Sequence, residues 1–304
     1  MLDESTKNII EGRKTFFIVP DTALFPESYL EDYLARGYET YIINDDRYCP
    51  LKVKIDIIIH TFTDSILFFY IDTVVEDIEW HTYIRDLQKR YGEKVLIGVL
   101  YAKRPNEDQK KRLEKYYLFD VGIQGGCISL EFQRTKNFAL IDRVMFANQA
   151  SGRRKNVRAI CDNNSKVNFM GKNGLIKGTV LDVSLSHFSC TFDIPLDIKL
   201  YEKVRHIMIN VNGFHFSTDA ILLMQRPVNN VTLYVFVFAN ANGQQGLDPD
   251  IQSRLLQKIY QIVNDRVKAL MWEKFDAARK ALNNPAHGRA YIPTDDGDIR
   301  DYYR

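Results

Sequence analysis

The feature that most constrains this chain is a change in the order of its structural signals near residue 158. Before that point, short apolar runs typical of buried strands alternate with amphipathic segments typical of helices. After it, several strand-like segments follow one another, separated by turn residues and not by helices. A chain of 304 residues is long enough for two domains of ordinary size. The change therefore predicts two domains of different fold class.

The first domain, expected over residues 1–130, has the pattern of an α/β fold. The runs TFFIVP, SILFFYID and KVLIGVLY are almost continuously apolar, as are parallel strands that are covered on both faces. Amphipathic segments such as PESYLEDYLARG lie between them, and Asn106 is placed to cap a later helix. We expect a doubly wound parallel sheet, followed by a connecting helix over residues 131–151. One segment is ambiguous: LKVKIDIIIHTFT occupies the place of a helix, but its first half alternates with the period of two typical of strands.

The second domain, expected over residues 152–284, has the pattern of a small antiparallel barrel. Asn-Gly pairs at residues 173–174 and 212–213 predict tight hairpins between its strands. A long amphipathic helix should close it, with Asp248 as its cap and Pro249 in its first turn. The fold class is therefore an α/β domain plus an all-β barrel with a C-terminal helix. The polar residues 285–304 are expected to form a flexible tail.

Composition excludes several classes of function. The chain has 41 basic and 39 acidic residues, and this balance favours neither DNA binding nor an anionic membrane surface. No apolar run approaches the length of a membrane span, and the beginning of the sequence lacks a signal-peptide pattern. The four cysteines are far apart and form no metal-binding motif, which fits a reducing compartment. We expect a cytoplasmic protein with no metal, no cofactor and no catalytic triad or acid pair, and therefore not an enzyme.

Positive charge is concentrated at the junction of the two domains. Arg153, Arg154 and Arg158 lie in the run GRRKNVR, just before the first barrel strand. Guanidinium groups bind phosphate oxygens or a guanine edge in a bidentate manner. Asp182 and Ser184, in the later run DVSLSH, stand at alternate positions and would point the same way from an extended strand. The two motifs together predict a clamp for an anionic nucleotide, although a solvated basic linker and ordinary turn residues remain the simpler interpretations.

These motifs resemble those of the PilZ domain, a bacterial receptor module for cyclic di-GMP. RRKNVR is similar to the RxxxR linker of that family, and DVSLSH matches its [D/N]xSxxG pattern except at the last position. The order of arginine linker, barrel and C-terminal helix is also that of the family. The resemblance implies that Arg153, Arg154 and Arg158 contact phosphates and guanines, and that Asp182 and Ser184 contact a guanine. It implies a receptor for cyclic di-GMP that signals to a protein partner by reorienting the two domains.

The last position of the motif is His187 where the family has glycine. Glycine at a turn often adopts a positive φ or allows a ligand to approach closely, and histidine accepts a positive φ only at a cost. His187 would therefore either crowd the ligand or stack on one of its bases. If it abolishes binding, the chain is a degenerate PilZ protein that acts only as a protein-interaction module.

Two further hypotheses concern other residues. The first domain is similar in its alternation to a response-regulator receiver domain, and Asp72 ends a buried strand where such a domain carries its phosphoacceptor. The accompanying residues are incomplete, because only Asp21 follows the first strand and the lysine of the fifth is missing, so we expect a degenerate receiver-like domain. The other hypothesis is a barrel that binds single-stranded RNA, and the near-neutral charge argues against it.

Overall fold

The computed structural model describes residues 12–19, 28–45, 49–62, 64–104, 106–131, 133–172, 174–228, 231–240 and 242–283. The chain divides into two compact units. Residues 1–155 and 267–304 form the first, called here the α/β unit, and residues 156–266 form the second, the barrel unit.

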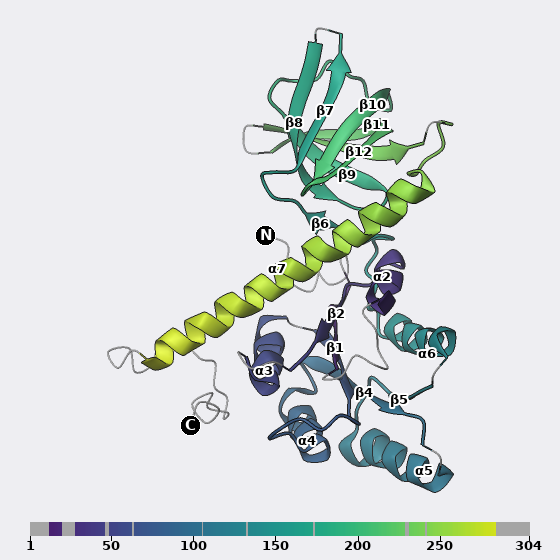
Figure 1. Ribbon diagram of the computed structural model, residues 1–304, viewed down its shortest axis with the longest axis vertical. Coiled ribbons are helices and arrows are strands. Elements are labelled where there is room, and N and C mark those ends of the chain that lie inside the picture. Colours follow the sequence, from purple (N-terminus) through teal and green to yellow (C-terminus); the bar gives the residue numbers. More distant parts are fainter. Residues whose placement is uncertain are drawn as a thin grey trace. The chain divides into compact units, whose positions relative to one another are not determined.

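The α/β unit is built on a five-stranded parallel sheet in the order β2-β1-β3-β4-β5, with helices on both of its faces (Figure 1). All residues of β1 and β3 are buried, as expected for the centre of such a sheet. The expected doubly wound α/β architecture is therefore confirmed. Its elements are β1 (Thr15–Ile18), α2 (Ser28–Ala35), β2 (Thr40–Ile43), α3 (Leu51–Thr61), β3 (Ser65–Tyr70), α4 (Trp80–Tyr91), β4 (Val95–Ala102), α5 (Glu107–Lys115), the π-helical turn η1 (Tyr116–Val121), β5 (Cys127–Leu130) and α6 (Arg134–Ala147).

The ambiguous segment is the helix α3 and not a strand. The segment connects the parallel strands β2 and β3, and a connection between parallel strands is usually a helix that crosses over one face of the sheet. Val53, Ile55 and Ile57, which alternate in the sequence, are all buried, and so are the apolar residues that follow them. The helix therefore lacks the usual division into one buried and one exposed face. Tertiary position therefore overrides the local alternation of the sequence.

Helices α2 and α6 pack against each other within the α/β unit. The rings of Tyr33 and Phe138 stack with their centroids 4.5 Å apart. Beside them, Arg36 Nη1 lies 2.9 Å from Asp142 Oδ2. The connecting helix that the sequence predicts before residue 151 thus belongs to the α/β unit and holds the end of α2 in place.

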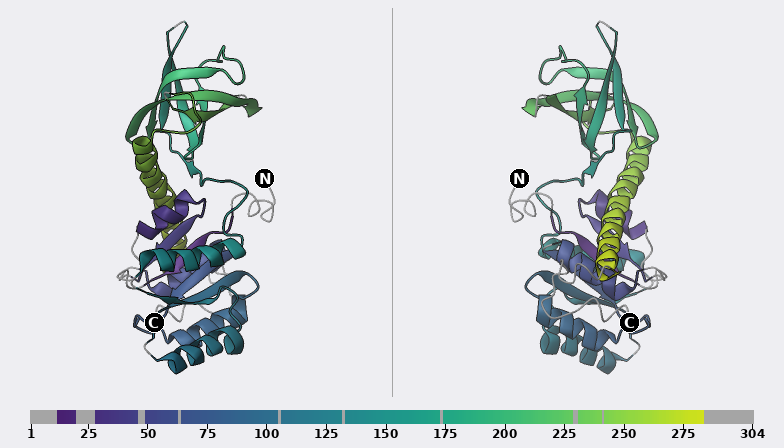
Figure 2. Two further views of the ribbon diagram at one scale, coloured as in Figure 1. Left: turned by 90° about the vertical axis from the view of Figure 1, so that its right-hand side faces the viewer. Right: turned by 90° about the vertical axis from the view of Figure 1, so that its left-hand side faces the viewer.

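The barrel unit is a closed antiparallel barrel of six strands in the circular order β8-β7-β10-β11-β12-β9, with β6 added beside β8 (Figures 1 and 2). Pairing of β8 with β9 closes the circle, which confirms the expected small barrel. Its strands are β6 (Ala159–Ile160), β7 (Lys166–Gly171), β8 (Gly174–Val183), β9 (His187–Phe192), β10 (Lys203–Val211), β11 (Phe214–Val228) and β12 (Val231–Ala239).

Stacked aromatic rings fill the barrel. Phe188 on β9 lies 5.2 Å from Phe236 and 5.3 Å from Phe238 on β12, measured between ring centroids, and all three side chains are fully buried. The hairpin between β10 and β11 turns at Asn212 and Gly213, whose φ angles are 45° and 88°. Two successive positive φ angles define the turn that an Asn-Gly pair favours, so this predicted hairpin is confirmed. Of the other predicted pair, Asn173 lies outside the described residues.

The C-terminal helix α7 (Pro249–Asn283) begins at the predicted proline. Its apolar stripe includes Leu255 and Ile259, which are buried within the barrel unit. Further along, Met271 and Phe275 are buried within the α/β unit. One helix thus contributes core residues to both units. The expected tail over residues 285–304 lies outside the described residues.

Candidate functional site

Strand β6 brings Arg158 beside Asp182. Ile160 of β6 is the register partner of Asp182 on β8, so the residue just before β6 runs alongside the same part of β8. Arg158 Nη1 lies 3.7 Å from Asp182 Oδ1, with side chains 36% and 27% exposed. Two residues 24 positions apart, each predicted from a different motif, therefore meet on the barrel. A half-exposed ion pair of this kind contributes little to stability, and both groups stay within reach of a ligand.

A β-bulge at Leu181 turns Asp182 away from the barrel interior. The register between β8 and β9 shifts between Val180 and Asp182. Val180 and Val183 are both fully buried, so the inward-facing phase of β8 changes by one residue at this point. Without the bulge, Asp182 would share the inward phase of Val180. In its outward position, the Asp182 carboxylate accepts a hydrogen bond from the Ser189 hydroxyl.

Ser184 lies past the end of β8, in the turn to β9. Its side chain is almost fully buried. The hydroxyl accepts a hydrogen bond from the His187 backbone N–H at 3.1 Å, and the Ser184 N–H donates to the His187 carbonyl oxygen at 2.8 Å. These bonds are turn chemistry of the kind that serine favours. The alternation that would align Ser184 with Asp182 does not extend into the turn.

His187 begins β9 and pairs with Val237 of β12. It is not among the described non-glycine residues with a positive φ, so of the two reasons for a glycine at this position the left-handed backbone does not apply. Its Nδ1 lies 2.7 Å from the Ser186 hydroxyl. Burial lowers the pKa of His187 below its ordinary value, the Arg158 guanidinium lowers it further, and Asp182 acts in the opposite direction. The ring is therefore neutral at pH 7 and belongs to the same cluster as Arg158 and Asp182.

Asn156 is part of this neighbourhood, and the sequence analysis did not single it out. Its side-chain amide donates a hydrogen bond of 2.9 Å to the Ser186 hydroxyl, and so ties the end of the arginine linker to the turn that carries His187. The sequence feature that could have indicated Asn156 as a site residue is its position between Arg154 and Arg158. Because asparagine is common in loops, that place alone was not distinctive.

Arg153 and Arg154 belong to the α/β unit, whose first segment ends at Lys155. Arg153 is exposed and Arg154 is half-buried. The six predicted residues are thus divided between the two units. In the barrel unit, Arg158, Asp182 and His187 lie close together. Ser184 is buried in the turn just before His187.

Asp72 follows β3 at the carboxyl end of the parallel sheet. Its Oδ2 accepts a hydrogen bond of 2.5 Å from the Ala102 backbone N–H, and its Oδ1 forms an ion pair with Arg104. The carboxylate is only 15% exposed. One oxygen therefore holds the last residue of β4 and the other holds Arg104 just after it, which is a structural role. The accompanying Asp21 lies outside the described residues.

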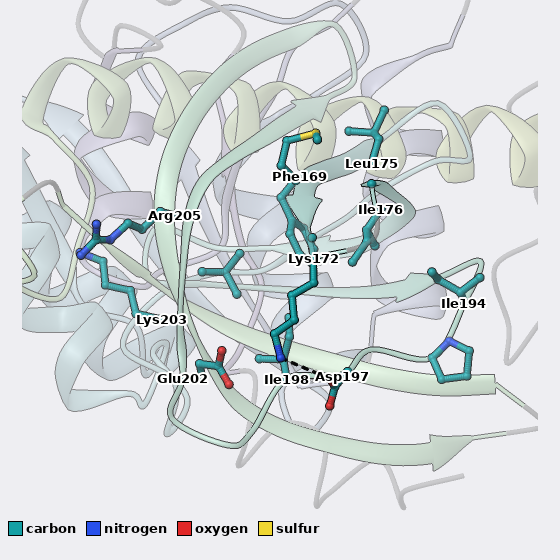
Figure 3. Close-up of a pocket in the computed structure, with 15 residues that line it drawn as sticks. Phe169, Lys172, Leu175, Ile176, Ile194, Asp197, Ile198, Glu202, Lys203 and Arg205 are labelled. Carbon is teal, nitrogen blue, oxygen red and sulfur yellow. Dashed lines mark hydrogen bonds and ion pairs between the residues drawn. The ribbon is translucent and has the colours of Figure 1, made fainter.

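A separate groove of about 300 Å³ lies between the β7–β8 hairpin, the loop after β9 and the beginning of β10 (Figure 3). Apolar side chains, among them Ile176, Ile194 and Ile198, line it. Lys172 and Asp197 form an ion pair of 3.4 Å at its edge. None of the six predicted residues lines this groove, so it is distinct from the predicted site.

Two other kinds of site are absent from the described part of the chain. No three or more His, Cys, Asp or Glu side chains are placed to hold a metal ion there. No helix among the described residues has the length and apolar character needed to cross a membrane.

The chain was compared with known proteins. No family model matches it, and no curated protein does. Among solved structures it is similar to YcgR of Escherichia coli in complex with c-di-GMP, with 18% identity over 43% of this chain and 51% of that chain and a TM-score of 0.30. It is also similar to the PilZ domain of YcgR with c-di-GMP, with 20% identity over 42% of this chain and 98% of that one and a TM-score of 0.29.

A third similar structure is the Bacillus subtilis inhibitor of motility MotI/DgrA, with 15% identity over 36% of this chain and 50% of that one and a TM-score of 0.30. The match therefore spans about half of the YcgR chain in the first structure and half of MotI.

Proposed function

We propose that the protein is a receptor for cyclic di-GMP and not an enzyme. The observation that carries this proposal is the cluster of Arg158, Asp182 and His187 at the entrance of the linker into the barrel. A guanidinium group can hold a phosphate or the O6 and N7 atoms of guanine. A carboxylate can accept hydrogen bonds from the N1–H and N2–H groups on the other edge of the same base. The cluster therefore offers complementary groups to a guanine nucleotide.

Asp182 is well suited to the base contact. Ser189 and Arg158 hold its carboxylate from two sides, so little conformational freedom is lost when a base binds. Ser184 acts indirectly, because its hydroxyl fixes the turn between Asp182 and His187. Arg153 and Arg154 supply further guanidinium groups from the linker, as a ligand with two phosphates and two guanines requires. Because they belong to the α/β unit, the bound ligand would connect the two units and signal to a protein partner.

The α/β unit is proposed to be a receiver-like module that does not accept phosphate. Its strand order is that of the flavodoxin-like doubly wound folds, in which receiver domains are included. Phosphoryl transfer to Asp72 would require both of its oxygens to leave Arg104 and Ala102. The function of this unit is then to respond to the ligand and not to a phosphodonor.

The test is calorimetry of the full chain with cyclic di-GMP, using GTP and cyclic di-AMP as control ligands. Replacement of Arg158 by Ala or of Asp182 by Asn should weaken binding by about 2 kcal/mol, roughly 30-fold, because a charge-assisted hydrogen bond is lost. Arg205→Ala is the matched control, since Arg205 is an exposed arginine on β10 of the same barrel. Its affinity should equal that of the wild type.

Two results would contradict the proposal. The first is unchanged affinity in both the Arg158→Ala and Asp182→Asn variants. The second is the absence of saturable cyclic di-GMP binding by the wild type, which would favour the degenerate PilZ hypothesis. Thermal unfolding of each variant shows that a loss of binding is not a loss of folding.

A further inference from the structure

The linker that carries Arg153 and Arg154 leaves helix α6 in a fixed direction. Gln149 has a positive φ of 54°, and the Ala150 N–H donates to the Met145 carbonyl oxygen at 2.9 Å. This is the pattern of a helix end closed by a left-handed residue. The strap, defined here as residues 150–155, therefore starts from a rigid point of the α/β unit.

Two glycines lie directly under the backbone of the strap. At Gly12, with a φ of +85°, an added Cβ would lie 2.3 Å from the Ala150 carbonyl oxygen. At Gly37, with a φ of +87°, it would lie 2.8 Å from the Lys155 carbonyl oxygen and 3.4 Å from that of Arg154. Contacts this short with backbone atoms leave no room for any side chain. The first and last residues of the strap are thus both seated on glycine.

A β-bridge fastens the strap between these two points. Tyr38 and Ser151 form an isolated antiparallel bridge just before the edge strand β2. Tyr38 is itself fixed, because it is buried and its N–H donates to the Tyr33 carbonyl oxygen at the end of α2. Gly12 and Tyr38 precede β1 and β2, so the strap lies at the amino end of the parallel sheet. Asp72 lies at the opposite, carboxyl end.

We infer that Gly12 and Gly37 fasten the strap to the α/β unit, and that the fastened strap couples this unit to the ligand. The inference rests on the proposed function. Arg153 and Arg154 have a backbone fixed to the α/β unit, whereas Arg158 and Asp182 belong to the barrel unit. A ligand held by both pairs must therefore bring the two units into one arrangement. If the strap is released, Arg153 and Arg154 can bind the ligand without moving the α/β unit with them.

Release of the strap should affect ligand affinity and the coupling between the units differently. Gly37→Ala should release the last part of the strap, since its Cβ would lie 2.8 Å from the Lys155 carbonyl oxygen, which is too close for a stable contact. Affinity for cyclic di-GMP should then be unchanged or tighter, because the ligand no longer has to arrange the units. The ligand-dependent change in the distance between the units should be lost.

Gly122→Ala is the matched control. Gly122 has a φ of +75° at the end of η1 in the same unit, but an added Cβ there meets nothing within 4 Å. Both variants carry the same kind of backbone strain, and only Gly37→Ala disturbs the strap. Gly12→Ala, at the other end of the strap, is a second test if Gly37→Ala does not fold.

The experiment uses the full chain with two fluorophores, one on Gln109→Cys in α5 and one on Ser217→Cys in β11, both exposed positions in different units. Burial raises the pKa of Cys127 to about 12 and that of Cys161 to about 11, so these native thiols react slowly at pH 7. Energy transfer is measured with and without cyclic di-GMP, and calorimetry gives the affinity of the same samples.

The inference is supported if the ligand changes the energy transfer in the wild type and in Gly122→Ala. In Gly37→Ala this change should be absent although the affinity is retained. If Gly37→Ala and Gly12→Ala respond to the ligand as the wild type does, the strap does not couple the units. Binding by the wild type without any change in transfer overturns the strap alone. No binding by the wild type overturns the proposed function and, with it, the inference.

Discussion

At the scale of single residues, His187 is the member of the cluster whose charge changes nearest to neutral pH. Burial and the neighbouring Arg158 lower its pKa below 6.5, so the folded barrel favours the neutral ring. The unfolded chain takes up a proton as the pH falls below about 6.5. Unfolding therefore absorbs a proton in this range, and the free energy of unfolding decreases as the pH falls from 6.5 toward the lowered pKa.

We expect His187→Gln to remove this part of the pH dependence. Glutamine keeps a polar partner for Ser186 but does not titrate. Urea unfolding at pH 7.5 and 5.5 should show a smaller loss of stability at low pH in His187→Gln than in the wild type. The control is His215→Gln, which removes an exposed histidine from the same barrel. Equal pH dependence in wild type and His187→Gln would mean that the ring is not held neutral.

At the level of helices and strands, the backbone conformation of the turns determines how neighbouring barrel strands are connected. The β10–β11 hairpin depends on Gly213, whose φ is 88° and around whose added Cβ there is open space. Gly213→Ala should therefore lower the free energy of unfolding through backbone strain alone, by about 1 kcal/mol.

Gly213→Asn distinguishes this explanation from a loss of packing. Asparagine accepts the left-handed conformation more readily than alanine, so this variant should lose less stability despite its larger side chain. Chemical unfolding of both variants measures the difference. If Gly213→Asn loses more stability than Gly213→Ala, then the space available at the turn, and not the φ angle, determines which residues position 213 accepts.

At the scale of the whole molecule, α7 supplies core residues to two units. Phe275 is 5% exposed and belongs to the α/β unit, whereas Leu255 and Ile259 are buried in the barrel unit. A charge at position 275 should therefore destabilise one unit and not the other. Phe275→Asp should lower the stability of the α/β unit by about 3 kcal/mol, since it removes a buried ring and buries a carboxylate.

Scanning calorimetry of the full chain checks this prediction. In a protein with two domains we expect two transitions. Cyclic di-GMP should raise the transition of the barrel the most, because Arg158 and Asp182 belong to the barrel unit, and this difference identifies it. Phe275→Asp should lower the other transition only. Lys274→Asp, at the exposed neighbouring position, should leave both unchanged. An equal drop of both transitions in Phe275→Asp would mean that α7 makes the chain one cooperative unit.

Features that depend on neighbouring residues could be predicted from the amino-acid sequence. Asn106 caps α5 through its side chain, Asn212 and Gly213 form the predicted turn, and Pro249 begins α7. The order of buried runs and amphipathic segments was enough for the doubly wound sheet and for the barrel. These predictions succeeded because backbone preference and hydrophobic period act over a few residues.

Features that depend on distant strands could not be predicted, because they are set by long-range packing and strand pairing. The crossover between β2 and β3 made α3 a helix against its own alternation. The register of β9 against β8 placed the bulge that turns Asp182 outward, and the same turn occupied the hydroxyl of Ser184. The seating of the strap on Gly12 and Gly37 joins segments more than a hundred residues apart. Strand register and backbone contact at such separation are set by long-range pairing, which local sequence does not encode.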